Sequence, residues 1–66
     1  MKIKKVDRYY SSALREYTYY VTYENGDITQ FAGHFKNLPE DVKNFIPAAG
    51  FQFMQSKSGE YFHRFS

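Results

Sequence analysis

Strand-forming and polar residues alternate along residues 17–31, and this pattern predicts a β-hairpin. The segment reads YTYYVTYENGDITQF, which is rich in the tyrosine, valine and threonine residues that favour strands. Asn25-Gly26 lies between the two halves. This dipeptide favours the two-residue type I′ turn, because both central residues of that turn need a positive φ.

The length of this loop decides which side chains share a face of the hairpin. With a two-residue loop, Tyr20 lies opposite Phe31. Thr22 then lies opposite Thr29 on the same face. The predicted core face contains Tyr17, Tyr19, Val21, Tyr23, Ile28 and Ala32. The alternative, a three-residue loop over residues 24–26 with a bulge, shifts the register by one and mixes the two sets; the Asn-Gly preference favours the shorter loop.

A second hairpin is predicted near the carboxyl end, where FQFMQ and EYFHRF flank the turn sequence SKSG. A three-residue loop over residues 57–59, with glycine last in a left-handed conformation, pairs Phe53 with His63. The same loop pairs Phe51 with Phe65. A two-residue loop would set Phe53 against an arginine and make a poorer hydrophobic face, so the pattern favours the longer loop.

The spacing of apolar residues between the two hairpins predicts one short helix. Its apolar stripe consists of Leu38, Val42, Phe45 and Ile46. Asn37 is the predicted N-cap, and Glu40 follows at the spacing of a capping box. Pro47 is predicted to end the helix after about two turns, so the helix needs to dock its stripe on the sheet.

The amino-terminal residues predict one more strand, over about residues 2–10, although Ile3 and Val6 are out of phase for a regular strand. The predicted order is β-β-β-α-β-β. This order corresponds to an α+β fold, a two-layer domain with an antiparallel sheet of about five strands and one short helix packed on it. A chain of 66 residues predicts a single domain over residues 1–66.

Composition and charge narrow the class of protein. The chain has no Cys, so no disulfide supports the small core, and a cytoplasmic location is predicted. No apolar run approaches the ~20 residues of a membrane span, and the residues after MKIKK lack the apolar segment of a signal peptide. The net charge of +2 is well short of the dense basic patch that phosphate contacts require.

Candidate catalytic chemistry is sparse. His34 and His63 each lack a second His or Cys at metal-ligand spacing. Ser, His and Asp residues are scattered, and the four glycines are too far apart to cradle a phosphate. The sequence therefore predicts a non-enzymatic protein with no cofactor and no metal; small RNA-cleaving toxins are the enzyme class that a compact basic sheet with one histidine would suit.

Seven Tyr and seven Phe exceed what one face of a small sheet readily buries, and the surplus predicts a binding surface. The first hypothesis is a protein-binding site made of Tyr20, Phe31, Tyr9, Tyr10, Thr22 and Thr29. The alternative is a platform for single-stranded nucleic acid, with phosphate contacts from Lys4, Lys5, Arg8, Arg15 and Arg64. Acidic residues near Tyr20 favour a protein partner. In a third interpretation, Tyr20 and Phe31 form a second core, covered by the helix or by an identical subunit.

In size, tyrosine content and lack of enzyme motifs, the chain resembles the small accessory and inhibitor proteins of phages and mobile elements. The resemblance covers composition and size alone. It implies an inhibitor or adaptor role and assigns no functional residue.

Overall fold

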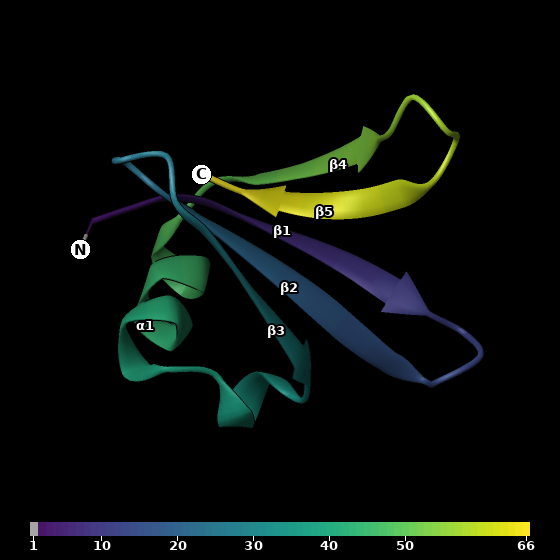
Figure 1. The fold of residues 1–66 in the computed structure, drawn as a ribbon, viewed down its shortest axis with the longest axis horizontal. Helices are drawn as coiled ribbons and strands as arrows, with labels where there is room; N and C mark the ends of the chain where they lie inside the picture. The colour runs from purple at the N-terminus through teal and green to yellow at the C-terminus, as the bar shows by residue number, and fades with distance from the viewer. Residues whose placement is uncertain (1) are drawn as a thin grey trace.

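The computed structural model describes residues 2–66 as a five-stranded antiparallel sheet with one helix against it (Figure 1). The elements are β1 (Ile3–Ser11), β2 (Glu16–Tyr23), β3 (Ile28–Gly33), the 3-10 turn η1 (Phe35–Asn37), α1 (Glu40–Ala48), β4 (Phe51–Gln55) and β5 (Tyr61–Phe65). The strands lie in the order β3-β2-β1-β5-β4. The predicted α+β class and the β-β-β-α-β-β order are confirmed.

Helix α1 packs its apolar stripe on one face of the sheet, which we call the helix side. Val42 and Ile46 of this stripe are buried, as is Leu38 just before the helix, and the partly buried Phe45 packs beside them. The core consists of Val6, Tyr19, Val21, Leu38, Val42, Ile46 and Phe65. A helix of nine residues is too short to be stable alone, so this docking holds it in place. None of the helices in residues 2–66 is long and apolar enough to cross a membrane.

The predicted N-cap of α1 is wrong. Asn37 ends the preceding 3-10 turn, and Pro39 occupies the N-cap position without a side-chain cap hydrogen bond. Leu38 between them is extended, with φ −72° and ψ 153°. This extended residue carries its side chain into the core, and it leaves Asn37 too far from the helix to cap it.

Pro47 lies inside the last turn of α1 and does not end the helix before it, contrary to the prediction. Proline removes one N–H from the hydrogen-bond ladder, and near a carboxyl end this loss affects little of the helix. The N–H of Ala49 donates to the carbonyl of Ile46, three residues earlier, at 3.3 Å. This 3-10 pattern tightens the last turn of the helix.

A bulge in β1 explains the irregular phase of its apolar residues. Ile3 pairs with Tyr23 and Lys5 pairs with Thr22, so the register shifts between these two positions of β1. The extra residue places Ile3 on the same face as Val6, which is completely buried. Both apolar side chains therefore pack toward the core.

The loop between β2 and β3 has three residues, so the predicted two-residue loop is wrong. The N–H of Tyr23 donates to the carbonyl of Asp27 at 2.8 Å, which closes the loop around residues 24–26. Gly26 takes the left-handed position with φ 95°. The side-chain Oδ1 of Asn25 accepts from the N–H of Asp27 at 3.0 Å. A turn followed by a left-handed glycine is the common three-residue hairpin loop.

The longer loop moves every side chain of β3 to the other face. Phe31 pairs with Tyr19, and Tyr20 pairs with Gln30, so the predicted pair of Tyr20 with Phe31 is wrong. Phe31 now packs against the core. Ile28, predicted as core, is 66% exposed on the face away from the helix. A shift of one residue has this effect because side chains alternate between the faces of a strand.

The second hairpin confirms its prediction. Phe53 pairs with His63, and Phe51 pairs with Phe65. Gly59 has φ 92° at the end of the three-residue loop. The prediction succeeds here because only one register makes a hydrophobic face.

Candidate functional site: a tyrosine-lined cleft

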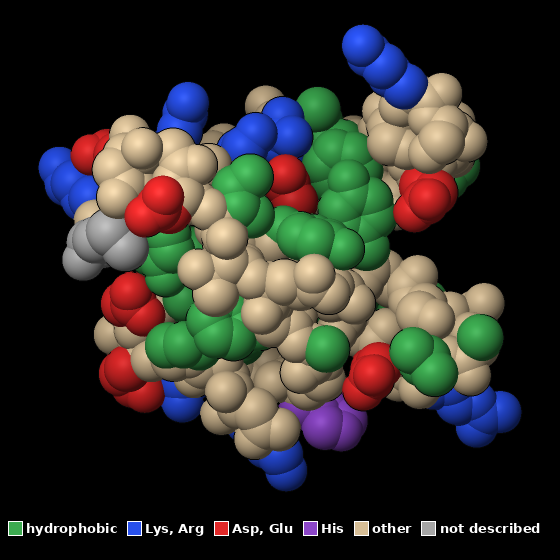
Figure 2. Space-filling view, in the orientation of Figure 1, with side chains coloured by type: hydrophobic (Ala, Val, Ile, Leu, Met, Phe, Trp, Pro, Cys, Tyr) green, Lys and Arg blue, Asp and Glu red, His purple; other side chains and the backbone are tan. Residues whose placement is uncertain are grey.

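The two hairpins of the sheet separate toward their tips and leave a cleft between them. Strand β1 pairs with β5 only over residues 6–8, whereas it stays paired with β2 as far as Ser11. The β4–β5 turn and the β1–β2 turn therefore diverge at the right of Figure 1. Figure 2 shows the surface hollowed between the two tips. The cleft has a volume of about 690 Å³.

Most of the side chains that line this cleft carry a hydroxyl group. They are Tyr9, Tyr20, Ser11, Thr18, Thr22, Ser56 and Ser58, with Lys5, Asp7, Ile28 and Glu60 completing the wall. Tyr10 also borders the cleft, but its ring lies on the helix side against Tyr17. Strands β1 and β2 supply one wall through alternating side chains of the face away from the helix. The β4–β5 turn supplies the other wall, so the cleft exists only where both hairpins come together.

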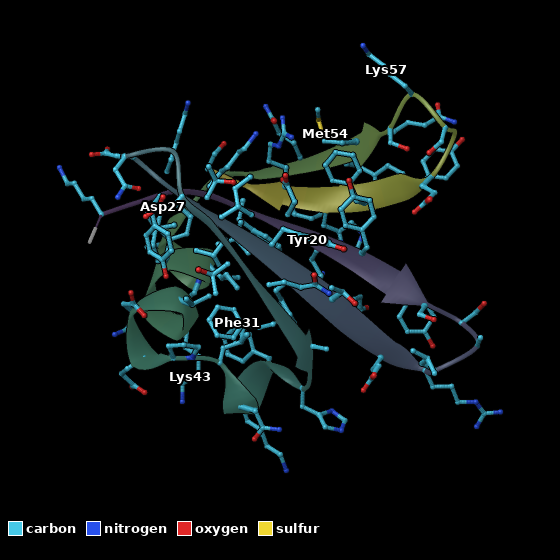
Figure 3. All side chains as sticks on the ribbon, viewed as in Figure 1. Tyr20, Asp27, Phe31, Lys43, Met54 and Lys57 are labelled. Atoms are coloured by element: carbon cyan, nitrogen blue, oxygen red, sulfur yellow. The ribbon has the colours of Figure 1, made fainter. Side chains whose placement is uncertain are left out.

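Three rings from three strands make the aromatic part of the cleft. Tyr9 stacks on Phe62, with ring centroids 4.7 Å apart and an angle of 23° between the rings. Tyr20 meets Tyr9 edge to face at 5.5 Å. Because Phe62 is buried, the stack anchors Tyr9 to β5. In Figure 3, Phe31 lies next to α1, whereas Tyr20 lies away from it, toward β5.

The hydroxyl of Tyr9 stays protonated at neutral pH and can donate a hydrogen bond, because its pKa is raised. Burial raises the pKa of Tyr9, and the carboxylates of Asp7 and Glu60 raise it further. Tyr20 adds to the increase, whereas Arg64 acts against it. A raised pKa keeps the neutral phenol, which both donates and accepts hydrogen bonds.

One residue of the cleft wall, Asp7, belongs to an ion pair with Arg64. The Nε of Arg64 donates to Oδ1 of Asp7 at 2.8 Å, and its Nη2 donates to Oδ2 at 3.3 Å. The guanidinium also lies 5.4 Å from the ring centroid of Phe62. The positive charge of Arg64 therefore balances the negative charge of Asp7 inside the protein. Within residues 2–66, the carboxylate of Glu60 and the ammonium group of Lys5 make no ion pair, and both border the cleft.

The structure brings together the side chains of three of the six residues predicted to bind a protein. The ring of Tyr10 instead contacts Tyr17 on the helix side, with ring centroids 5.1 Å apart. Tyr9, Tyr20 and Thr22 line the cleft. Phe31 and Thr29 do not, because the register of β3 turns them to the helix side. The same alternation that selects Tyr9 and Tyr20 could have predicted Ser11 and Thr18. Nothing in the sequence points to Ser56, Ser58 or Glu60, which reach the cleft through the pairing of β5 with β1.

The five predicted phosphate ligands do not form one patch. They are Lys4, Lys5, Arg8, Arg15 and Arg64. Arg64 holds the ion pair described above, and Arg8 extends on the helix side of the sheet, where it donates to His63. Arg15 lies in the β1–β2 turn with φ 54°, at the far tip of its hairpin. These basic side chains therefore lie on both faces of the sheet and at a turn.

A second aromatic surface lies on the helix side of the sheet. Arg8 donates to Nδ1 of His63 through Nη2 at 2.7 Å and Nε at 3.2 Å. Because a guanidinium has no acceptor, Nδ1 is unprotonated and the ring carries its proton on Nε2. Arg8 also lies over the ring of Tyr17, 4.5 Å from its centroid. Burial lowers the pKa of His63, and the positive charge of Arg8 lowers it further.

This contact predicts a loss of stability in mild acid. The unfolded chain takes up the histidine proton near its ordinary pKa of 6.5, whereas folded His63 takes it up only at lower pH. Stability is therefore unaffected above about pH 6.5 and falls as the pH drops from there toward the folded pKa. Thermal unfolding at about pH 7.5 and about pH 5 measures the effect.

The matched control for this prediction is His63→Gln, whose amide oxygen can still accept from Arg8 but does not titrate. We expect a smaller acid-induced drop in melting temperature for the variant than for the unaltered protein. Equal drops in the two proteins would show that His63 has no part in the effect.

Within residues 2–66, no three His, Cys, Asp or Glu side chains gather as a metal site would need. Comparisons with protein-family models, with curated proteins and with solved structures find no match for this chain. The shape and chemistry of the cleft are therefore the best guide to what the protein binds.

Proposed function

We propose that this protein is a small non-enzymatic binding domain that holds an extended segment of a partner protein in the tyrosine-lined cleft. The observation that carries the proposal is the convergence of Tyr9 and Tyr20 with Ser and Thr hydroxyls from two hairpins. Tyrosine gives large contact area at low cost in side-chain entropy, and hydroxyls adapt to peptide N–H and C=O groups. An inhibitor or adaptor acting in the cytoplasm would use such a site.

The length of the cleft suggests the length of the bound segment. Lys5 and Ser11 border it at opposite ends of β1. The seven residues from Lys5 to Ser11 span six steps, a rise of about 20 Å, so a segment of about seven residues would run along this wall. Glu60 projects from the turn opposite the Ser11 end. We therefore expect a basic side chain in the segment near Glu60 and an acidic or neutral one near Lys5.

The charges of the cleft favour a protein partner over a nucleic acid. A phosphate chain would pass Glu60, and Lys5 is the only basic residue of the described chain, residues 2–66, that lines the cleft. Single-strand binding sites instead combine aromatic rings with a continuous positively charged groove. Arg8 and Arg15 are too scattered to supply one.

Selection from a peptide-display library tests the proposal. We expect enriched peptides with basic residues to bind the unaltered protein, and to lose at least about tenfold in affinity on Tyr20→Ser, because a central tyrosine is a typical binding hot spot. Glu60→Lys should change the preference from basic to acidic peptides. Tyr61→Ser is the matched control, since Tyr61 is exposed outside the cleft.

Two outcomes would reject the proposal. In the first, no peptide is enriched, or the enriched peptides bind Tyr20→Ser and Glu60→Lys as well as they bind the unaltered protein. In the second, a labelled single strand binds with an affinity that falls steeply as salt is raised. The second outcome would favour the nucleic-acid alternative.

A further inference from the structure

Strand β4 is an open edge of the sheet with the features of a pairing surface. It is the last strand in the order β3-β2-β1-β5-β4 and lies at the outer edge of the sheet in Figure 1. Its sequence, FQFMQ, has no charged residue and no proline. Proteins usually protect edge strands with charges, prolines or bulges, because an unprotected edge pairs with another strand.

Exposed rings lie beside this edge on the helix side. Phe51 is 58% exposed, Phe53 is 63% exposed and Tyr61 is 61% exposed. We call these three residues together with His63 the aromatic row. Their ring centroids are 5.2 to 5.5 Å apart from one to the next. The row is a contiguous apolar surface at the open edge, and such surfaces typically mark sites of association.

The hydrogen bonds between β4 and β5 show which backbone groups face outward. Gly50 donates to Ser66, and Ser56 donates to Glu60, at the two ends of the β4–β5 ladder. In an antiparallel pair these bonds occur at every second residue. The residues at positions 52 and 54 therefore also bond to β5, and those at positions 51, 53 and 55 point their N–H and C=O groups away from the sheet.

We propose that β4 pairs antiparallel with β4 of a second copy of this chain, around a two-fold axis at Phe53. This register pairs all three outward-facing residues: Phe53 with its own copy, and Phe51 with Gln55 in both directions. The backbone bonds and the rings reinforce each other, because the side chains of these positions lie on the helix side with the aromatic row. In this register no charged side chain of β4 lies opposite the same side chain of the second copy, because β4 has no charged residue.

The composition of β4 favours a second copy over an unrelated partner. A two-fold contact requires a self-complementary surface, and a strand with Phe at its centre and uncharged residues on both sides meets that requirement. The other open edge, β3, is also uncharged, but its outward-facing backbone groups belong to residues whose side chains include no aromatic ring. Gln30 would lie at the centre of a β3 pair, so β3 offers much less apolar contact.

The area of the contact indicates a weak dimer. Three rings that are each about 60% exposed would bury on the order of 300 Å² per copy, since a ring side chain buries about 150–250 Å² when fully covered. With the edge backbone and the glutamines, the total is on the order of 1,000 Å², at the low end of specific interfaces. We expect a dissociation constant of about 10 µM to 1 mM. The interface lies at the opposite edge of the second hairpin from the cleft and does not depend on the proposed function.

Sedimentation across a range of concentrations tests the dimer. The unaltered protein should change from monomer to dimer as its concentration rises. Phe53→Lys should weaken the dimer at least tenfold, because it sets two like charges directly opposite each other. Gln30→Lys is the matched control at the centre of the β3 edge and should leave the dimer intact. Both positions are exposed, so both variants should fold.

Amide hydrogen exchange distinguishes strand pairing from nonspecific association. As concentration rises, exchange should slow at Phe51, Phe53 and Gln55. Exchange at Gln52 and Met54, already bonded to β5, should not change. A monomer at all concentrations, a dimer without this alternation, or a dimer lost in Gln30→Lys and kept in Phe53→Lys would each overturn the inference.

Discussion

Tyr19→Ala should leave the protein largely unfolded at 25 °C. Tyr19 is 1% exposed and lies at the centre of the core, beneath the helix stripe. Truncating a buried aromatic side chain to alanine typically costs about 3–5 kcal/mol, because apolar contacts are lost and a cavity remains. A domain of this size has a total stability of only about 3–5 kcal/mol without disulfides or a metal. Circular dichroism and denaturant unfolding measure the loss.

The neighbouring Tyr20→Ala is the matched control for this result. It removes the same ring one position along β2, but from the half-buried side that faces the cleft. We expect this variant to remain folded and to lose less than half the stability that Tyr19→Ala loses. Equal losses would mean that both faces of β2 are core, and that the cleft is not an open surface.

Asp7→Ala should have the second-largest effect, a loss of about 1–3 kcal/mol at neutral pH. The Asp7 and Arg64 side chains are 13% and 26% exposed, so removing the carboxylate leaves a mostly buried guanidinium without its anion. Leaving the Arg64 guanidinium unpaired lowers the stability by more than the ion pair itself contributes. The reason is that the remaining positive charge is partly removed from water and has no anion beside it. Denaturant unfolding of the single variant measures the cost.

The double variant Asp7→Ala/Arg64→Met separates the two parts of that cost. Methionine retains an apolar contact for Phe62 and leaves no unpaired charge. We expect the double variant to be more stable than Asp7→Ala alone. A double variant that is less stable, with the two losses simply added, would show that the guanidinium is adequately solvated without Asp7.

The local signals in the sequence were sufficient for the strands and the helix, but not for the register of the first hairpin. Asn25-Gly26 fits two kinds of loop, and the local preference favours the shorter one. The longer loop places Phe31 beside Tyr19 under the helix and exposes Ile28. The second hairpin has no such ambiguity, because only one register keeps its phenylalanines on one face.

The cleft could be predicted only in part, because it is built by contacts between distant parts of the chain. Tyr9 and Tyr20 belong to one hairpin, and their alternation with Ser and Thr is visible in the sequence. The opposite wall depends on pairing of β5 with β1, which joins residues such as Arg8 and His63 that are 55 positions apart. No local pattern predicts such a pairing or the point at which the strands separate.

Amide chemical-shift mapping with a display-selected peptide tests the central claim most directly. If the cleft binds an extended segment, the largest shifts will fall at Tyr9, Ser11, Tyr20, Ser58 and Glu60, which belong to both walls. Residues of α1 and β3 on the helix side will change little. Large shifts on the helix side, with the amides of the two cleft walls unaffected, would contradict the claim.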